Sequence, residues 1–215
     1  QLRALWQLAG LAADGEACLT AVGGFGRGEL FPYSDIDVLV LLPGSASAAL
    51  TQRVEHFVGS CWDAGLEIGS SVRTVAQCLE ESARELTIQT ALLEARRVTG
   101  SETLYAQFRN GFDAQMDPRA FLAAKLLEMR QRHGKHDFTP YALEPNCKES
   151  PGGLRDLQTM LWLAKAAGLG GSWKELARNG LITEFEREQL DSNEALLSLI
   201  RARLHAVAGR HEDRL

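Results

Sequence analysis

Apolar residues follow two different patterns along the chain, and the change comes near residue 100. Before it, short apolar runs rich in β-branched residues alternate with segments of helical spacing, a pattern typical of a mixed α/β sheet. After it, leucine and alanine recur at i, i+3 and i+4, which predicts helices. We therefore expect an α+β fold in which a small mixed-sheet domain, residues 1–100, precedes an all-helical domain, residues 101–215.

The same patterns predict individual elements. The strands expected in the first domain are residues 19–22, 35–42 and 65–74. The helices expected there are residues 1–13, 46–64 and, in two pieces, 75–93. The helices expected in the second domain are residues 102–112, 118–131, 154–167, 173–179 and 183–208. The helix at 46–64 would bury Leu50, Val54, Phe57, Val58 and Trp62.

The most informative segment joins a glycine-rich turn to two acids. Gly23 and Gly24 precede Asp35 and Asp37, which lie two residues apart at the head of the second predicted strand. Side chains two apart on a strand leave the same face, and two neighbouring carboxylates repel each other unless a cation lies between them. Mg²⁺ prefers such oxygen ligands, and glycines let backbone N–H groups approach a triphosphate. The segment therefore predicts a metal-dependent nucleotidyl-transfer site; two acids that only begin a strand are the alternative.

Composition narrows the class of partner. The formal net charge of -5 over 215 residues argues against binding to a nucleic-acid backbone, so a protein or a small molecule is the expected acceptor. The four cysteines form no CxxC pair, and the five histidines show no metal-binding spacing. A reducing cytoplasm is therefore expected. Charge interrupts every long apolar stretch, so we expect no membrane insertion.

Several segments carry a resemblance to a known family. GGFGRGELFPYSDIDVLVL is similar to the nucleotidyltransferase signature of the DNA polymerase β superfamily. It resembles more closely the family of bifunctional uridylyltransferase and uridylyl-removing enzymes that modify the PII nitrogen-signalling protein. Three further segments resemble that family: residues 65–74, LTIQTALLEARRVTG and EPNCKESPGGLRDLQ. The resemblance implies transfer of UMP from UTP to a tyrosine of PII, with release of pyrophosphate.

Three alternative functions remain open. The first is another nucleotidyltransferase of the superfamily, such as an adenylyltransferase, and the second is an inactive sensor that binds nucleotide. The third is a helical module that only binds protein, through its acidic second half. The chain begins with Gln1 and ends on the charged segment RHEDRL, so we expect a piece of a longer protein. The family's phosphohydrolase and regulatory domains, with uridylyl removal and glutamine sensing, would then lie outside this chain.

The resemblance also implies site residues. Mg²⁺ would be held by Asp35, Asp37 and a third carboxylate, for which Glu94 is the first candidate and Glu67 the second. The implied nucleotide-binding residues are Gly23, Gly24, Arg27, Ser34, Lys148, Gly152, Gly153 and Arg155.

Two of these assignments have a structural alternative. Gly152 and Gly153 precede a predicted helix, whose free N–H groups would form an anion site. The alternative is a plain helix start in which Arg155 and Asp156 pair with neighbouring elements. Arg27 would either bind phosphate or pair with a carboxylate.

Overall fold

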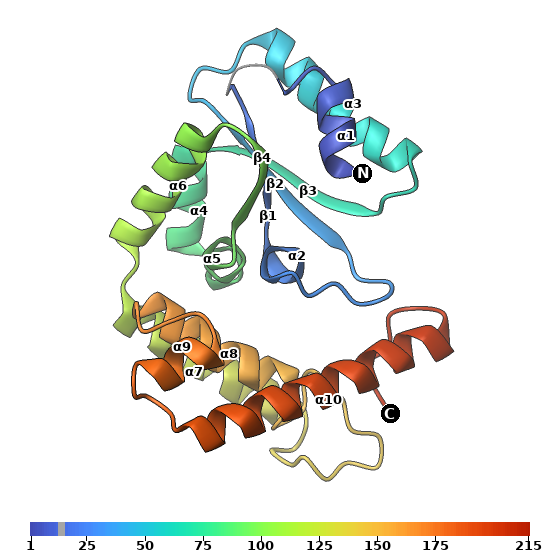
Figure 1. Ribbon diagram of the computed structural model, residues 1–215, viewed down its shortest axis with the longest axis vertical. Coiled ribbons are helices and arrows are strands. Elements are labelled where there is room, and N and C mark those ends of the chain that lie inside the picture. Colours follow the sequence, from blue (N-terminus) through green and yellow to red (C-terminus); the bar gives the residue numbers. More distant parts are fainter. Residues whose placement is uncertain (13–15) are drawn as a thin grey trace. The chain divides into compact units, whose positions relative to one another are not determined.

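The computed structural model describes residues 1–12 and 16–215, which form two compact units (Figure 1). The first unit contains Gln1–Leu30 and Asp35–Met116, and the second contains Phe31–Ser34 and Asp117–Leu215. The helices of the first unit are α1 (Leu2–Leu8), α2 (Gly23–Arg27), α3 (Ala48–Asp63), α4 (Val75–Arg84), α5 (Leu86–Leu93) and α6 (Glu102–Gln115). Helix α6 packs on α4, so the units divide after α6, whereas the composition change placed the boundary before it.

A four-stranded sheet with the order β3-β2-β1-β4 forms the centre of the first unit. Strand β2 (Ile36–Leu42) pairs antiparallel with β1 (Cys18–Ala21) and parallel with β3 (Ile68–Thr74). Strand β4 (Arg96–Gly100) pairs antiparallel with β1 at the sheet edge. The mixed sheet confirms the α+β prediction. The pattern did not predict β4, because this strand begins with two exposed arginines and has no buried apolar run.

Alternate residues of β2 face different helices. Val38 and Val40 belong to a core shared with α1 and α3, whereas Leu39 and Leu41 are fully buried on the other face. Figure 1 shows α1 and α3 on one side of the sheet and α4, α5 and α6 on the other. Both faces are covered, which explains why β2 is an almost continuous apolar run.

The inner face of α3 differs from the prediction at one position. Leu50, Val54, Phe57 and Cys61 are buried, and these positions follow the helical repeat. Trp62 is 58% exposed, so its predicted burial is wrong. The helical repeat places Cys61, the residue before Trp62, on the face of α3 that meets the sheet.

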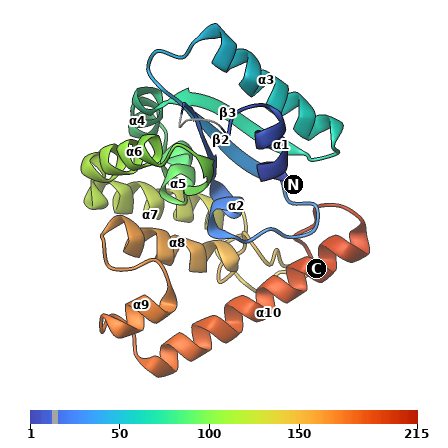
Figure 2. The same cartoon turned by 45° about the horizontal axis from the view of Figure 1, so that its top comes forward.

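The second unit is helical, as predicted. Its helices are α7 (Pro118–Gly134), α8 (Leu154–Ala166), α9 (Trp173–Arg178) and α10 (Glu184–Ala208). Helix α8 packs against α7 and α10, and α9 packs against α10 (Figure 2). A capping box formed by Thr183 and Glu186 begins α10, and Gly209 ends it in a left-handed conformation. In the described part of the chain, no helix has both the length and the hydrophobicity that crossing a bilayer requires.

Candidate functional site

The glycine segment forms a short helix, where the sequence predicted a turn. Strand β1 leads through Val22 into α2, which begins at Gly23 with φ 55° and is followed by Gly28 with φ 82°. The Val22 N–H donates to the Asp37 carbonyl oxygen at 3.1 Å. This bond ties the start of α2 to the start of β2, where the acid pair lies.

The Asp37 carboxylate fits between two glycines. A Cβ atom on Gly23 would lie 3.2 Å from Asp37 Oδ2, and one on Gly69 would lie 2.6 Å from Oδ1. Gly69 is the residue opposite Asp37 in the parallel pairing of β2 and β3. The absence of side chains at both positions therefore leaves space for the carboxylate.

The electrostatics of the acid pair suit a bound cation. Burial raises the pKa of Asp37, and the negative charge of Asp35 raises it further. Asp35 is exposed just before β2, and Asp37 is partly buried within it. Two neighbouring carboxylates, one of them with its charge destabilised, offer the oxygen ligands that divalent ions of the Mg²⁺ type prefer.

The two candidates for the third acid occupy different places. The Ile36 N–H donates to the Glu67 carbonyl oxygen at 3.2 Å, and Ile36 pairs with Ile68, so Glu67 lies opposite Asp35. Neighbours in register project to the same face of a sheet, and Glu67 therefore shares a face with Asp35. Glu94 follows α5 and is 8% exposed. Within the described residues, neither acid forms with Asp35 and Asp37 a group of three ligands close enough to hold one ion.

Arg27 and Ser34 both have structural partners. Arg27 was expected either to bind phosphate or to pair with a carboxylate. Its Nε donates to the Glu29 carboxylate at 2.8 Å, which corresponds to the second role. Ser34 belongs to the second unit, where its Oγ accepts from the Phe31 N–H at 3.1 Å. Ser34 therefore closes a turn immediately before Asp35.

The prediction of free N–H groups before α8 is wrong. The Gly152 N–H donates to Asp156 Oδ2 at 2.7 Å, and the Gly153 N–H donates to the Ser150 carbonyl oxygen at 2.9 Å. A side chain on Gly153 would meet three carbonyl oxygens at 2.8 to 2.9 Å. This glycine is therefore required for the close packing of the backbone, and the N–H groups are used within the protein.

The charged residues at the start of α8 form ion pairs, as in the structural alternative. Arg155 lies 3.2 Å from Glu149, and the Asp156 carboxylate contacts Arg132 and His133. Burial alone would raise the pKa of Asp156. Hydrogen bonds from Arg132, the Gly152 N–H and His133 outweigh it, and the pKa lies below its usual value.

Positive charge gathers near Lys148. Its Nζ lies 3.8 Å from the Asp213 carboxylate and 3.9 Å from that of Glu149. Burial lowers the pKa of Lys148, and the charges of Arg201 and Arg155 lower it further. The ammonium group is therefore held among other cations, balanced by two acids.

Sequence reasoning missed a cluster formed by the last turn of α10 and the segment that follows this helix. His205, His211 and Asp213 place three possible ligand atoms within 4.8 Å of one another, the only such group found among the described residues. The spacing of the histidines along the chain did not predict this group, because folding brings its three members together. The chain turns at Gly209, so no helical or strand period connects the three positions.

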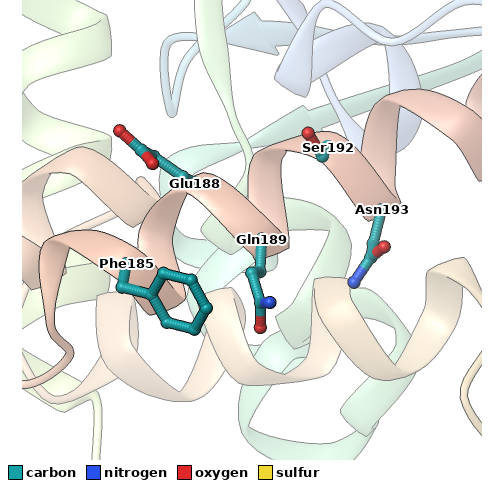
Figure 3. Close-up of a pocket in the computed structure, with 5 residues that line it drawn as sticks. All are labelled: Phe185, Glu188, Gln189, Ser192 and Asn193. Atoms are coloured by element: carbon teal, nitrogen blue, oxygen red, sulfur yellow. The ribbon is translucent and has the colours of Figure 1, made fainter.

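A pocket lies along one helix, and none of the predicted site residues lines it. Its lining comes entirely from α10 (Figure 3): Phe185, Glu188, Gln189, Ser192 and Asn193. Its lining contains one acid and one serine but no histidine, cysteine or cation that would activate the serine hydroxyl, so we assign it no chemistry.

Comparison with known proteins places two family models on the chain. Residues 8–93 match the nucleotidyltransferase domain, and residues 120–215 match the GlnD PII-uridylyltransferase model. The Asp35 and Asp37 pair lies within the first match. Nucleotidyltransferase domains generally use a divalent metal ion, which the oxygen ligands of this pair suit.

Similar full-length proteins are named bifunctional uridylyltransferase/uridylyl-removing enzyme. The one from Cupriavidus pinatubonensis is 62% identical over 204 residues, which cover 95% of this chain and 24% of that protein. The one from Burkholderia orbicola is 59% identical over 214 residues, which cover 100% of this chain and 25% of that protein. The one from Burkholderia pseudomallei is 59% identical over 212 residues, which cover 99% of this chain and 24% of that protein. The chain thus spans about a quarter of the length of these curated relatives.

Proposed function

We propose that this chain, which belongs to the family of bifunctional uridylyltransferase/uridylyl-removing enzymes, transfers UMP from UTP to a tyrosine of a PII-type protein and releases pyrophosphate. The observation that carries the proposal is the acid pair Asp35 and Asp37, whose inner member fits between two glycines inside the nucleotidyltransferase match. A cytoplasmic location is part of the proposal, supported by four buried free cysteines.

The proposed ion is Mg²⁺, held by Asp35 and Asp37. When bound, such an ion neutralises charge on the triphosphate and lowers the pKa of the acceptor hydroxyl. The chain's own contribution is geometric. Gly23 and Gly69 leave space for the Asp37 carboxylate, while exposed Asp35 is accessible to a substrate.

The third acid is proposed to be Glu94 or Glu67, and the sheet register supports Glu67. Glu67 directly precedes β3 and lies opposite Asp35, on the same face of the sheet, whereas Glu94 follows α5 and is not paired with β2. The variants Glu67→Gln and Glu94→Gln separate the two. Substitution of the acid that ligates the metal should lower the rate of UMP transfer on the order of 100-fold, and substitution of the other acid should leave the rate unchanged.

The nucleotide-binding residues stay predictions. Lys148 and Arg155 are supported by the positive charge gathered around Lys148. Gly152 and Gly153 have less support, because their N–H groups bond within the protein. The remaining predictions for this role are Gly23, Gly24, Arg27 and Ser34.

The direct test mixes the chain with a PII protein, UTP and Mg²⁺ and follows the mass of PII. Addition of UMP should be visible, and Asp35→Asn or Asp37→Asn should lower its rate by at least about 100-fold without loss of folding. Asp63→Asn, which changes an exposed acid at the end of α3, is the matched control and should transfer normally. Normal transfer by a variant carrying both Asn substitutions would overturn the proposal.

One further candidate is favoured by a specific observation. Because no third acid among the described residues completes a metal group with the Asp pair, the domain could bind nucleotide without turnover. Binding of UTP without release of pyrophosphate in the presence of PII would identify such a sensor. Transfer of AMP from ATP in place of UMP would instead identify an adenylyltransferase.

A further inference from the structure

Residues Phe31–Ser34 pack with the second unit, although the chain on both sides of them belongs to the first. They form a tight turn, in which the Ser34 N–H donates to the Phe31 carbonyl oxygen at 3.0 Å. Tyr33 adopts φ 60°, a left-handed conformation that is unfavourable for any residue with a Cβ atom. Such a conformation persists only where its surroundings hold it in place.

Two residues of α10 contact this turn. His205, which is completely buried, directs Nδ1 at the Pro32 carbonyl oxygen and forms a hydrogen bond with it. The Arg201 guanidinium lies 4.3 Å from the centroid of the Phe31 ring, within cation–π range. One residue therefore holds the backbone of the turn, and the other holds its first side chain.

Asp213 fixes both α10 residues. Its Oδ1 accepts from Arg201 Nε at 2.6 Å and lies 3.3 Å from His205 Nε2. The backbone of Asp213 is held in turn, since its carbonyl oxygen accepts from the Cys147 N–H at 2.8 Å. The orientation of both contacts to the turn is thus determined by a buried, fully paired network.

The same network could be taken for a metal centre, but its pairing argues otherwise. Arg201 Nη2 lies 3.1 Å from His211 Nε2, so it occupies the lone pair that an ion would need. The charge of Asp213 is already balanced by Arg201 and by Lys148. A divalent ion would bring two further charges beside these cations, so we assign the cluster a mechanical role.

We propose that His205 and Arg201 are positioning residues for nucleotidyl transfer, because they hold the Phe31–Ser34 turn and with it the orientation of Asp35. Ser34 is bonded directly to Asp35, so rotation of the backbone at Tyr33 or Ser34 would swing the first metal-binding carboxylate. A misplacement of about 1 Å at a reacting centre costs on the order of 100-fold in rate. The inference rests on the proposed function, since it assigns Asp35 to the metal.

The test compares two substitutions of His205 that differ only in hydrogen bonding. His205→Asn keeps an amide donor near the position of Nδ1, and His205→Leu removes it. We expect His205→Leu to lower kcat by about 10-fold to 100-fold with little change in KM for UTP, and to weaken Mn²⁺ binding, followed by electron paramagnetic resonance, by about 10-fold. The His205→Asn variant should keep most of the wild-type kcat and most of the wild-type Mn²⁺ affinity. Arg203→Ala, an exposed change on the same helix, should leave both unchanged.

A second substitution separates positioning from general stability. Tyr33→Gly makes the left-handed conformation favourable. In a His205→Leu background it should therefore restore part of kcat and of Mn²⁺ affinity, which a loss of helix packing would not allow. If His205→Leu does not fold, Phe31→Leu takes its place, since it removes the Arg201 contact without altering α10.

The two proposals fail in different ways. A His205→Leu chain that folds with wild-type kcat and Mn²⁺ affinity overturns the positioning role and leaves the proposed function intact. A wild-type chain that binds Mn²⁺ but transfers no UMP overturns the proposed function, and the Mn²⁺ affinities of the His205 variants then decide the positioning role. A wild-type chain that binds no Mn²⁺ overturns the role assigned to Asp35, and the inference with it.

Discussion

Asp37 and Gly69 lie opposite each other on the parallel strands β2 and β3, and the Asp37 carboxylate occupies the space that a Gly69 side chain would fill. A Cβ atom there would lie 2.6 Å from Asp37 Oδ1, closer than any real contact. The glycine on β3 therefore determines where the carboxylate of β2 can lie.

Gly69→Ala should displace the Asp37 carboxylate. We expect UMP transfer to fall on the order of 100-fold, because the inner metal ligand moves, while the fold is retained. Gly44→Ala is the matched control, since a Cβ atom on Gly44 meets nothing within 4 Å. Initial rates of PII modification at saturating UTP measure both, and equal rates for the two variants would contradict the assignment.

Asp37→Asn should stabilise the metal-free chain. The folded pKa of Asp37 is raised by burial and by Asp35, so the ionised carboxylate lowers stability at pH values above that pKa. Removing the charge should raise the melting temperature at neutral pH by about 1–3 °C in the presence of EDTA. Mg²⁺ should then raise the melting temperature of the wild type and not that of the variant.

Calorimetry with and without Mg²⁺ makes this comparison. Asp63→Asn should behave like the wild type in both conditions, because Asp63 is exposed at the end of α3. A variant at Asp37 that melts below the wild type in EDTA would show that the carboxylate has a stabilising partner.

Gly26→Ala and Gly59→Ala should change stability in opposite directions. A Cβ atom on Gly26 would lie 2.2 Å from the Glu94 carbonyl oxygen, so α2 would have to move away. We expect a loss of about 1–3 kcal/mol in the free energy of unfolding. Gly59 lies within α3 with open space around it, and alanine there should add about 0.5–1 kcal/mol. Urea denaturation measures both, and a neutral Gly26→Ala would exclude the close packing.

Asp156 should contribute stability that depends on pH. Burial opposes its charge, but Arg132, the Gly152 N–H and His133 lower its folded pKa below the unfolded value. This contribution is therefore present above the unfolded pKa and is lost as the pH falls through the folded one. Asp156→Asn should cost about 2 kcal/mol at neutral pH, and the difference from the wild type should shrink below about pH 4.

Urea denaturation at a series of pH values tests the dependence on Asp156. Glu144→Gln is a suitable control, because Glu144 is exposed and forms no ion pair among the described residues. A difference between wild type and Asp156→Asn that stays constant with pH would mean that the ion pairs are not its source.

Periodicity located most elements because their apolar faces are long. The two-piece helix predicted at 75–93 is observed as α4 and α5, separated at Glu85, and β2 is found within one residue of its predicted start. The apolar pattern did not predict strand β4, because this strand pairs with β1 through backbone hydrogen bonds, which leave no pattern in the side chains. Local patterns thus predict elements that bury a face, and they miss elements that only complete an edge.

The acid pair and the glycines around it are determined by the sequence alone, because residues within one short segment of chain carry them. Only the tertiary structure decided that Gly69 makes room for Asp37, that the N–H groups at Gly152 and Gly153 are already used, and that His205 reaches Pro32. Each of these contacts joins positions far apart in the chain, or depends on the path of the backbone between them. Steric fit and hydrogen-bond satisfaction are properties of atoms brought together by folding, so no residue pattern could state them in advance.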